Sequence, residues 1–235
     1  DPAGRDTQFA YDADGNLSTI TTPELCQTQF AYDSLHRMTA IVDPRGYRTS
    51  FAYNGDNRLV KITDPLNNVK TLTYDSATQT TLTDPRGNNW VSTFSLQGNL
   101  ATLKNPLNQI TSYTWENNRL TAVKDANGNT TTFSYDSGGN LSKQQDAQSN
   151  VTTLIYDSSK NLTQRTDPLN RTTTFVYDTA RNLIRQIDAL NNTTTFTYNS
   201  KGQVTEVQDA ANAQSSTGNR TTNVYDATTG QLTAV

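Results

Sequence analysis

The sequence of 235 residues has little of the chemistry that most enzymes and metalloproteins need. It contains one cysteine, Cys26, and one histidine, His36. A single cysteine excludes an intrachain disulfide, and a single histidine without a cysteine or histidine partner excludes a zinc site. We therefore expect no catalytic site, no metal ion and no cofactor. We interpret Cys26 as inert and His36 as a residue of a tight turn.

Apolar residues and clustered charges are also scarce. Hydrophobic residues make up 33% of the sequence, and no apolar run is long enough to cross a membrane. The formal net charge is −3 and the charged residues are scattered, so no basic patch indicates nucleic-acid binding. We expect neither nucleic-acid binding nor membrane insertion. No signal peptide is visible and neither end carries a capping unit, so we interpret the sequence as part of a longer polypeptide.

The sequence consists instead of a repeat of about 21 residues. In most units an aromatic residue is followed by aspartate, and an apolar residue such as Leu59 comes six positions after the aromatic one. The Tyr74 unit is one residue short. We expect the aromatic column to be buried between neighbouring hairpins, with Tyr53, Tyr156 and Tyr177 among the most buried residues. The column consists of Tyr11, Tyr32, Tyr53, Tyr74, Phe94, Trp115, Tyr135, Tyr156, Tyr177, Tyr198 and Tyr225.

A second column marks a turn in every unit. All seven prolines share one position, which alanine fills in the other units, and Gly or Asn usually follows two residues later, as at Gly46 and Asn67. Proline presets φ for the first turn position, and Gly or Asn tolerates a positive φ. The pattern D-P-x-G/N therefore predicts a three-residue hairpin loop, a type I turn followed by a left-handed residue.

The segments between the turns are typical of β-strands. Phe51 and Tyr53 alternate with Ala52, which predicts one aromatic and one polar face. Leu59 and Ile62 are three apart, which indicates either a bulge or a strand covered on both faces. We predict an all-β fold with more than 40% strand and almost no helix: about eleven antiparallel hairpins in a single coiled, spiral or shell-like sheet. Residues 1–235 form one repeat region, in which the insertion Ala210–Gly218 is expected to be a surface loop.

Several motifs have two interpretations. Asp12–Asn16 resembles the start of a calcium loop, although the later glutamate is missing, and a structural turn is the alternative. The aspartate after each tyrosine is either an acidic row or a turn cap, and its repetition favours the cap. The aromatic column either binds sugars or packs between hairpins. Sequons indicate N-glycosylation or merely turn-ending asparagines before threonine-rich strands; they include Asn16, Asn129, Asn150, Asn161, Asn170 and Asn191.

The repeat also resembles a known family. YDADGNL (11–17), YDSGGNL (135–141) and YDTARNL (177–183), each followed by the turn pattern above, are similar to the YD repeats of Rhs proteins, of Tc toxin B and C components and of teneurins. The resemblance implies a spiral β-shell, which in the bacterial proteins encloses a toxic C-terminal domain of the same polypeptide. The self-cleaving segment and the effector domain of that family have no counterpart in this sequence.

These observations lead to a structural function rather than an enzymatic one. We expect a shell segment of a bacterial Rhs protein, secreted or on the cell surface, that encloses or carries a toxin or effector domain. The alternative is an extracellular adhesive module that binds a carbohydrate or another partner through its loops. The expected partners are the toxin domain, other shell segments of the same polypeptide, and a secretion apparatus or surface partner.

Overall fold

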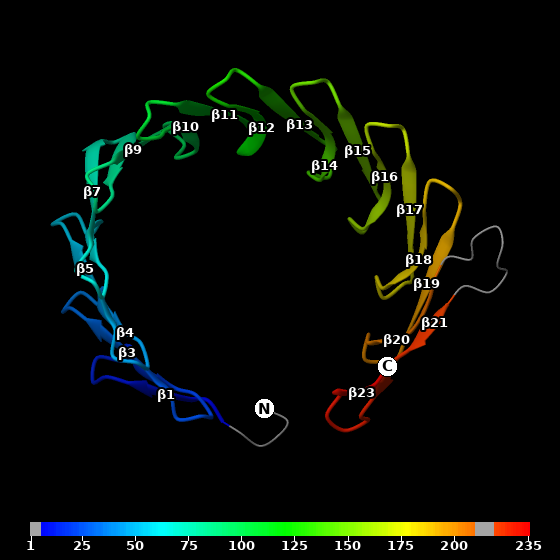
Figure 1. Ribbon diagram of the computed structural model, residues 1–235, viewed down its shortest axis with the longest axis horizontal. Coiled ribbons are helices and arrows are strands. Elements are labelled where there is room, and N and C mark those ends of the chain that lie inside the picture. The colour runs from blue at the N-terminus through cyan, green and yellow to red at the C-terminus, as the bar shows by residue number, and fades with distance from the viewer. Residues whose placement is uncertain (1–5, 210–218) are drawn as a thin grey trace. The chain divides into compact units, whose positions relative to one another are not determined.

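The computed structural model describes residues 6–209 and 219–235. About half of the chain lies in strands, and the described residues contain no helix (Figure 1). The predicted all-β class and the predicted strand content are therefore confirmed. The insertion Ala210–Gly218 lies outside the described residues.

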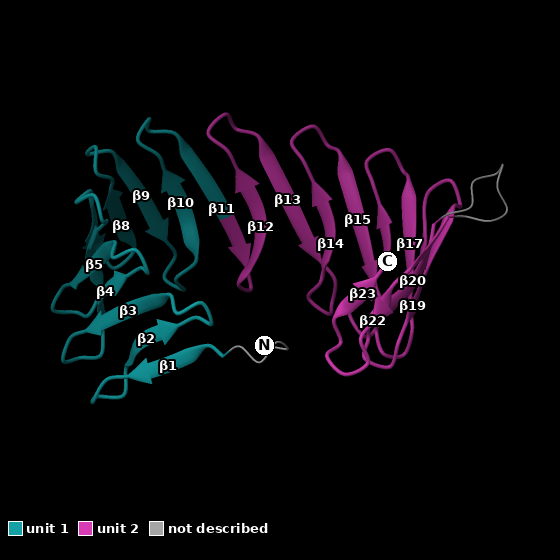
Figure 2. Cartoon of the chain, turned by 60° about the horizontal axis from the view of Figure 1, so that its bottom comes forward, with its two compact units in different colours: residues 1–113 teal, residues 114–235 magenta. Residues whose placement is uncertain are grey.

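The chain divides into two compact units, residues 1–113 and 114–235 (Figure 2). The strands of unit 1 are β1 (Gln8–Tyr11), β2 (Leu17–Thr21), β3 (Gln27–Tyr32), β4 (Met38–Val42), β5 (Arg48–Tyr53), β6 (Leu59–Thr63), β7 (Val69–Ser76), β8 (Gln79–Thr83), β9 (Asn89–Phe94), β10 (Leu100–Lys104) and the first part of β11 (Ile110–Glu116). Within this unit each strand pairs with the next one in the chain, and every pairing is antiparallel.

Unit 2 continues the same repeat. Its strands after β11 are β12 (Arg119–Lys124), β13 (Thr130–Tyr135), β14 (Leu141–Gln145), β15 (Val151–Tyr156), β16 (Leu162–Thr166), β17 (Thr172–Tyr177), β18 (Leu183–Ile187), β19 (Thr193–Tyr198), β20 (Val204–Gln208), β21 (Arg220–Thr222), β22 (Val224–Tyr225) and β23 (Leu232–Ala234). Strands β12 to β21 pair in chain order, whereas β22 and β23 form a separate two-stranded sheet. The last hairpin therefore departs from the otherwise continuous pattern.

A β-bulge explains the spacing of Leu59 and Ile62. Tyr53 pairs with Leu59 but Ala52 pairs with Lys61, so β6 holds one extra residue, Val60. The extra residue returns Ile62, the partner of Phe51, to the same face as Leu59. The bulge, one of the two explanations of this spacing, is therefore confirmed. The same register shift recurs in hairpins β1–β2, β3–β4, β9–β10, β13–β14, β15–β16, β17–β18, β19–β20 and β22–β23.

The bulges give each unit two distinct faces. One face, which we call the aromatic face, carries Phe51, Tyr53, Leu59, Ile62 and the residues in register with them. The opposite face, which we call the threonine face, carries Ala52, Lys61 and their register equivalents, many of which are threonines. The predicted alternation of an aromatic and a polar face is confirmed.

The expected burial of the tyrosine column is wrong. Tyr53, Tyr156 and Tyr177 are half-buried, and Tyr11 on β1 has 64% of its surface exposed. Ala40 is the only buried hydrophobic residue among those that the structure describes. The physical reason is that each strand packs mainly against its neighbours in the chain, so adjacent side chains shield each tyrosine only from the sides.

Candidate functional site: the turn and tyrosine columns

Most hairpins carry the same five-residue turn at both ends. In the turn that starts at Asp43, the Gly46 N–H donates to the Asp43 carbonyl and the Asp43 N–H donates to the Tyr47 carbonyl, both at 2.9 Å. Gly46 has φ = 85°. The predicted type I turn with a left-handed residue is confirmed, and the turn that follows the tyrosine, such as Asp12–Asn16, has the same bonds.

The left-handed position explains two residues that the sequence singles out. His36 occupies it with φ = 59°, in agreement with its interpretation as a turn residue, and its Nδ1 lies 2.7 Å from Asn16 Oδ1 in the corresponding turn of the preceding hairpin. Asn170 and Asn191, two of the sequon residues, occupy the same position. Cys26 is exposed and free.

The aspartate that opens each turn caps it. Asp178 Oδ1 accepts the backbone N–H of Asn182 at 2.8 Å, and the Asn182 side-chain amide donates to Asp178 Oδ2 at 2.9 Å. These bonds, the side-chain bond first, hold the pKa of Asp178 below its ordinary value of 3.8. The cap interpretation of the aspartate column is therefore supported at the level of individual bonds.

The Asp12 carboxylate accepts several hydrogen bonds within its own turn. It accepts the backbone N–H groups of Asp14 and Asn16 and the side-chain amide of Asn16. This arrangement favours the structural turn over the calcium loop. Within residues 6–209 and 219–235, no group of three or more His, Cys, Asp or Glu residues is placed to hold a metal ion.

The residue four positions after the aspartate was missed from the sequence. In many turns it is an asparagine whose amide bonds to the aspartate, and in two turns an arginine pairs with it, as in Asp33–Arg37 and Asp167–Arg171. The recurring Asn-Leu at the start of the second strand is the signal that could have revealed this pair. The asparagine examples are Asp64–Asn68, Asp84–Asn88, Asp125–Asn129, Asp136–Asn140, Asp146–Asn150, Asp157–Asn161, Asp178–Asn182 and Asp188–Asn192.

The tyrosine hydroxyls tie each hairpin to the preceding one. The Tyr53 O–H donates to the Met38 carbonyl at 2.8 Å, and the Tyr198 O–H donates to the Leu183 carbonyl at 2.8 Å. Both acceptors lie 15 residues earlier, at the residue that adjoins the bulge. Tyr74, Tyr135 and Tyr225 make equivalent bonds to Leu59, Leu120 and Val204. The column therefore joins successive repeats by specific bonds as well as by contact.

Burial and neighbouring charge raise the pKa of two tyrosines in the same column. Desolvation, followed by the charge of Asp157, raises the pKa of Tyr177 above its ordinary value of 10.0. Tyr198 shifts in the same direction because of burial, and then because of Asp178 and Tyr177. Each of these tyrosines thus senses the turn of the preceding repeat.

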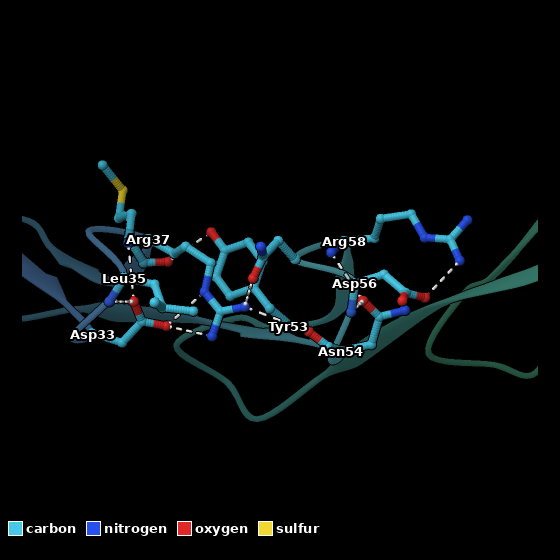
Figure 3. Close-up of polar contacts among 9 residues, drawn as sticks. Asp33, Leu35, Arg37, Tyr53, Asn54, Asp56 and Arg58 are labelled. Atoms are coloured by element: carbon cyan, nitrogen blue, oxygen red, sulfur yellow. Dashed lines mark hydrogen bonds and ion pairs between the residues drawn. The ribbon is translucent and has the colours of Figure 1, made fainter.

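Arginines lie over the rings of several tyrosines. The Arg37 guanidinium lies 4.9 Å from the centre of the Tyr53 ring, bonds to Asp33, and also donates to Asn57 Oδ1 at 2.8 Å (Figure 3). Arg58 lies over Tyr74 at 4.2 Å in the same way. Such contacts contribute about 0.5–1 kcal/mol at exposed sites. Arg37 therefore bridges the corresponding turns of two neighbouring hairpins and contacts the tyrosine that precedes the second turn.

Comparisons with known proteins identify the family. A model of the RHS repeat matches residues 53–88, 115–151, 156–190 and 181–214, which together make up more than half of the chain. The chain belongs to the Rhs repeat family. No curated protein matches the sequence. The match to the RHS repeat model confirms the resemblance seen in the sequence.

Solved structures of Tc toxin proteins share the fold of this Rhs-repeat chain. The crystal structure of TcdB2–TccC3–Cdc42 has a TM-score of 0.63 at 14% identity, and the match covers 96% of this chain and 15% of that one. The Photorhabdus luminescens Tc holotoxin pore has a TM-score of 0.65 at 14% identity, with 97% and 15% covered. TcdB2–TccC3 without its hypervariable C-terminal region scores 0.61 at 13% identity, with 94% and 15% covered. This chain therefore spans about 15% of the length of those proteins.

The carboxylates are bonded within their own turns, and the tyrosine hydroxyls that donate to backbone carbonyls act as structural links. No helix in the described part is both long and apolar enough to cross a membrane. What the arrangement provides chemically is a repeated, self-bonded strand array.

Proposed function

We propose that this Rhs-repeat chain is a shell segment that encloses a toxin or effector domain of the same polypeptide, in a bacterial protein that is secreted or exposed on the cell surface. It acts sterically and not as an enzyme. Its partners are the enclosed domain and further shell segments, with a secretion apparatus or surface partner outside. It binds no nucleic acid and does not insert into membranes.

The observation that carries the proposal is the family membership together with how the polar groups are used. Main-chain groups form hydrogen bonds along the strands, and the turn aspartates accept hydrogen bonds within their own turns. Tyrosine hydroxyls donate hydrogen bonds to the carbonyls next to the bulges. A barrier of this kind has few unpaired polar groups through which it would react with its contents. The fold shared with TcdB2–TccC3 supports the same function.

Limited proteolysis of the whole polypeptide that contains this chain tests the proposal. We expect the C-terminal domain to resist protease in the unaltered protein. The double substitution Tyr53→Ala and Tyr74→Ala should expose that domain, because it removes two consecutive links between hairpins. Cleavage of the C-terminal domain in the unaltered protein, at the rate of the isolated domain, would refute enclosure.

A second candidate, partner binding through the loops, is favoured by one observation. Leu66, Leu107, Leu169 and Leu190 occupy the third position of their turns and have 72–80% of their surface exposed. Arg45 and Arg86 occupy the same position in other turns, so turn formation does not require leucine there. Leu169→Gln with Leu190→Gln should abolish adhesion under this candidate and leave protease protection unchanged under the first.

A further inference from the structure

The aromatic face of unit 2 carries a polar column that unit 1 lacks. Gln144, Arg165 and Gln186 pair with Phe133, Leu154 and Phe175 in three consecutive hairpins. The equivalent partners in unit 1 are apolar, as in the pairs Phe30–Ile41, Phe51–Ile62 and Ser92–Leu103. The three polar side chains therefore replace an apolar column on an aromatic face.

Threonines on the following strands pair with the three polar residues of this column. Gln144 pairs with Thr152, Arg165 with Thr173 and Gln186 with Thr194 across the next strand pair. Three rows on this face therefore each run from an apolar side chain through a glutamine or arginine to a threonine. Within the described residues Arg165 is exposed, and no acidic side chain lies within ion-pair distance of it.

A shallow hollow of about 350 Å³ lies between the first two residues of the column, Gln144 and Arg165. Gln144, Thr152, Leu154 and Arg165 line it. Asp146 also lines the hollow, but its two carboxylate oxygens accept three hydrogen bonds within its own turn. The free charge that the hollow presents is therefore the Arg165 guanidinium, whose planar fork matches a carboxylate.

We infer that the Gln144–Arg165–Gln186 column binds an acidic segment of the enclosed polypeptide, with a Glu or Asp carboxylate on Arg165. A polypeptide fits better than a free anion because Phe133, Leu154 and Phe175 adjoin the polar groups, so the face also offers apolar contact for an extended or amphipathic segment. The inference rests on the proposed function and adds the charge of the cargo and the face that it touches.

Photo-crosslinking in the whole polypeptide tests it, because Arg185 supplies a matched control. Arg185 is also exposed but pairs with Val176, which places it on the threonine face. Benzoylphenylalanine at position 186 should capture a peptide of the C-terminal domain that contains Asp or Glu, whereas the same probe at position 185 should not. Arg165→Glu should reduce the yield at position 186 by roughly tenfold, and Arg185→Glu should leave it unchanged.

Three outcomes overturn the inference: capture of a peptide without Asp or Glu, equal capture at positions 185 and 186, or a yield that Arg165→Glu does not change. Failure of the proposed function has a separate signature. In that case protease cleaves the C-terminal domain in the unaltered protein, whereas a polypeptide that protects this domain but shows one of the three outcomes refutes the acidic contact alone.

Discussion

Units 1 and 2 share one repeat but use its positions differently. In unit 1 the residue opposite the phenylalanine column is apolar, as at Ile20, Ile41 and Ile62. In unit 2 three consecutive hairpins hold Gln144, Arg165 and Gln186 at the same position, and the following hairpin has Val207 there. The residue that opens each turn is more uniform in unit 2, where aspartate opens every described turn from Asp125 to Asp188. In unit 1 several turns open with other residues instead: Thr22, Asn54, Ser95 and Asn105.

The difference shows that strand pairing and turn caps can sustain the repeat where apolar contact is missing. Half-buried apolar side chains contribute only part of the roughly 1.5–3 kcal/mol of a fully buried one. Regular Asp–Asn pairs supply local order at both ends of each hairpin, so the face between them is free to carry polar groups. Unit 2 therefore depends more on charged caps, and unit 1 more on its apolar column.

Lowering the pH should produce the largest difference in stability between the two units. The hydrogen bonds that lower the pKa of Asp146, Asp157 and Asp178 exist only in the folded chain, so these caps stabilise it above pH 3.8. The unfolded chain binds protons first as the pH falls, and the stabilisation is lost as the pH passes through the lower folded pKa values. Hydrogen exchange followed by mass spectrometry below pH 3.8 should show unit 2 opening before unit 1.

The control for this prediction is Asp178→Asn. Asn199 already caps a turn with its Oδ1, which accepts the backbone N–H groups of Lys201 and Gln203, each at 3.0 Å. An amide at position 178 should therefore keep the turn and remove its titration. Equal opening of the two units in acid would contradict the dependence of unit 2 on its carboxylates.

Removing a tyrosine should have the next largest effect. We predict that Tyr156→Ala lowers the free energy of unfolding by about 2 kcal/mol, which is below the 3–5 kcal/mol expected of a buried aromatic residue. Tyr53→Ala should cost more, because it also removes the bond to the Met38 carbonyl and the contact with Arg37. Urea unfolding measures both values. A larger loss at Tyr156 than at Tyr53 would contradict this order.

Exchanging the column residues should move stability in opposite directions. Ile62→Gln should destabilise unit 1 by about 1 kcal/mol, and Gln186→Ile should stabilise unit 2 by up to about 1 kcal/mol, because each side chain is half-buried beside a phenylalanine. Thermal melts of the two variants and of the double variant provide the test. Destabilisation by Gln186→Ile would show that the polar column itself contributes to folding.

Removing one hydroxyl should give the smallest change. Tyr198→Phe deletes the donor to the Leu183 carbonyl and should cost about 0.5–1.5 kcal/mol. The hydrogen exchange of β18 and β19 should rise more than that of β13 and β14, since the lost bond joins two particular hairpins. A uniform rise across unit 2 would argue against a local link.

Local chemistry made most of the fold predictable. Pro44 and Gly46 specify their turn through their own backbone preferences, and the alternation of Phe51 and Tyr53 specifies a strand with two faces. The spacing of Leu59 and Ile62 even carried the signature of the bulge. These features depend on neighbours in the chain, which a sequence displays directly.

The properties that depend on distant neighbours were harder to predict. The burial of Tyr53 depends on whether another layer covers it, and its hydroxyl bonds to a carbonyl of the preceding repeat. The polar column is visible only once the bulge has assigned Gln144 and Arg165 to the aromatic face. Strand periodicity alone, with the bulge omitted, places them on the opposite face.

The tyrosine hydrogen bonds also influence the order in which the repeats can assemble. Each acceptor carbonyl precedes its donor in the chain, by 15 residues for Met38 and Tyr53 and by 21 for Val204 and Tyr225. During synthesis a hairpin therefore leaves the ribosome with that carbonyl unsatisfied and is completed only when the following tyrosine emerges. Assembly in the order of synthesis satisfies each repeat in turn, whereas a chain refolding from denaturant can pair its hairpins in any order.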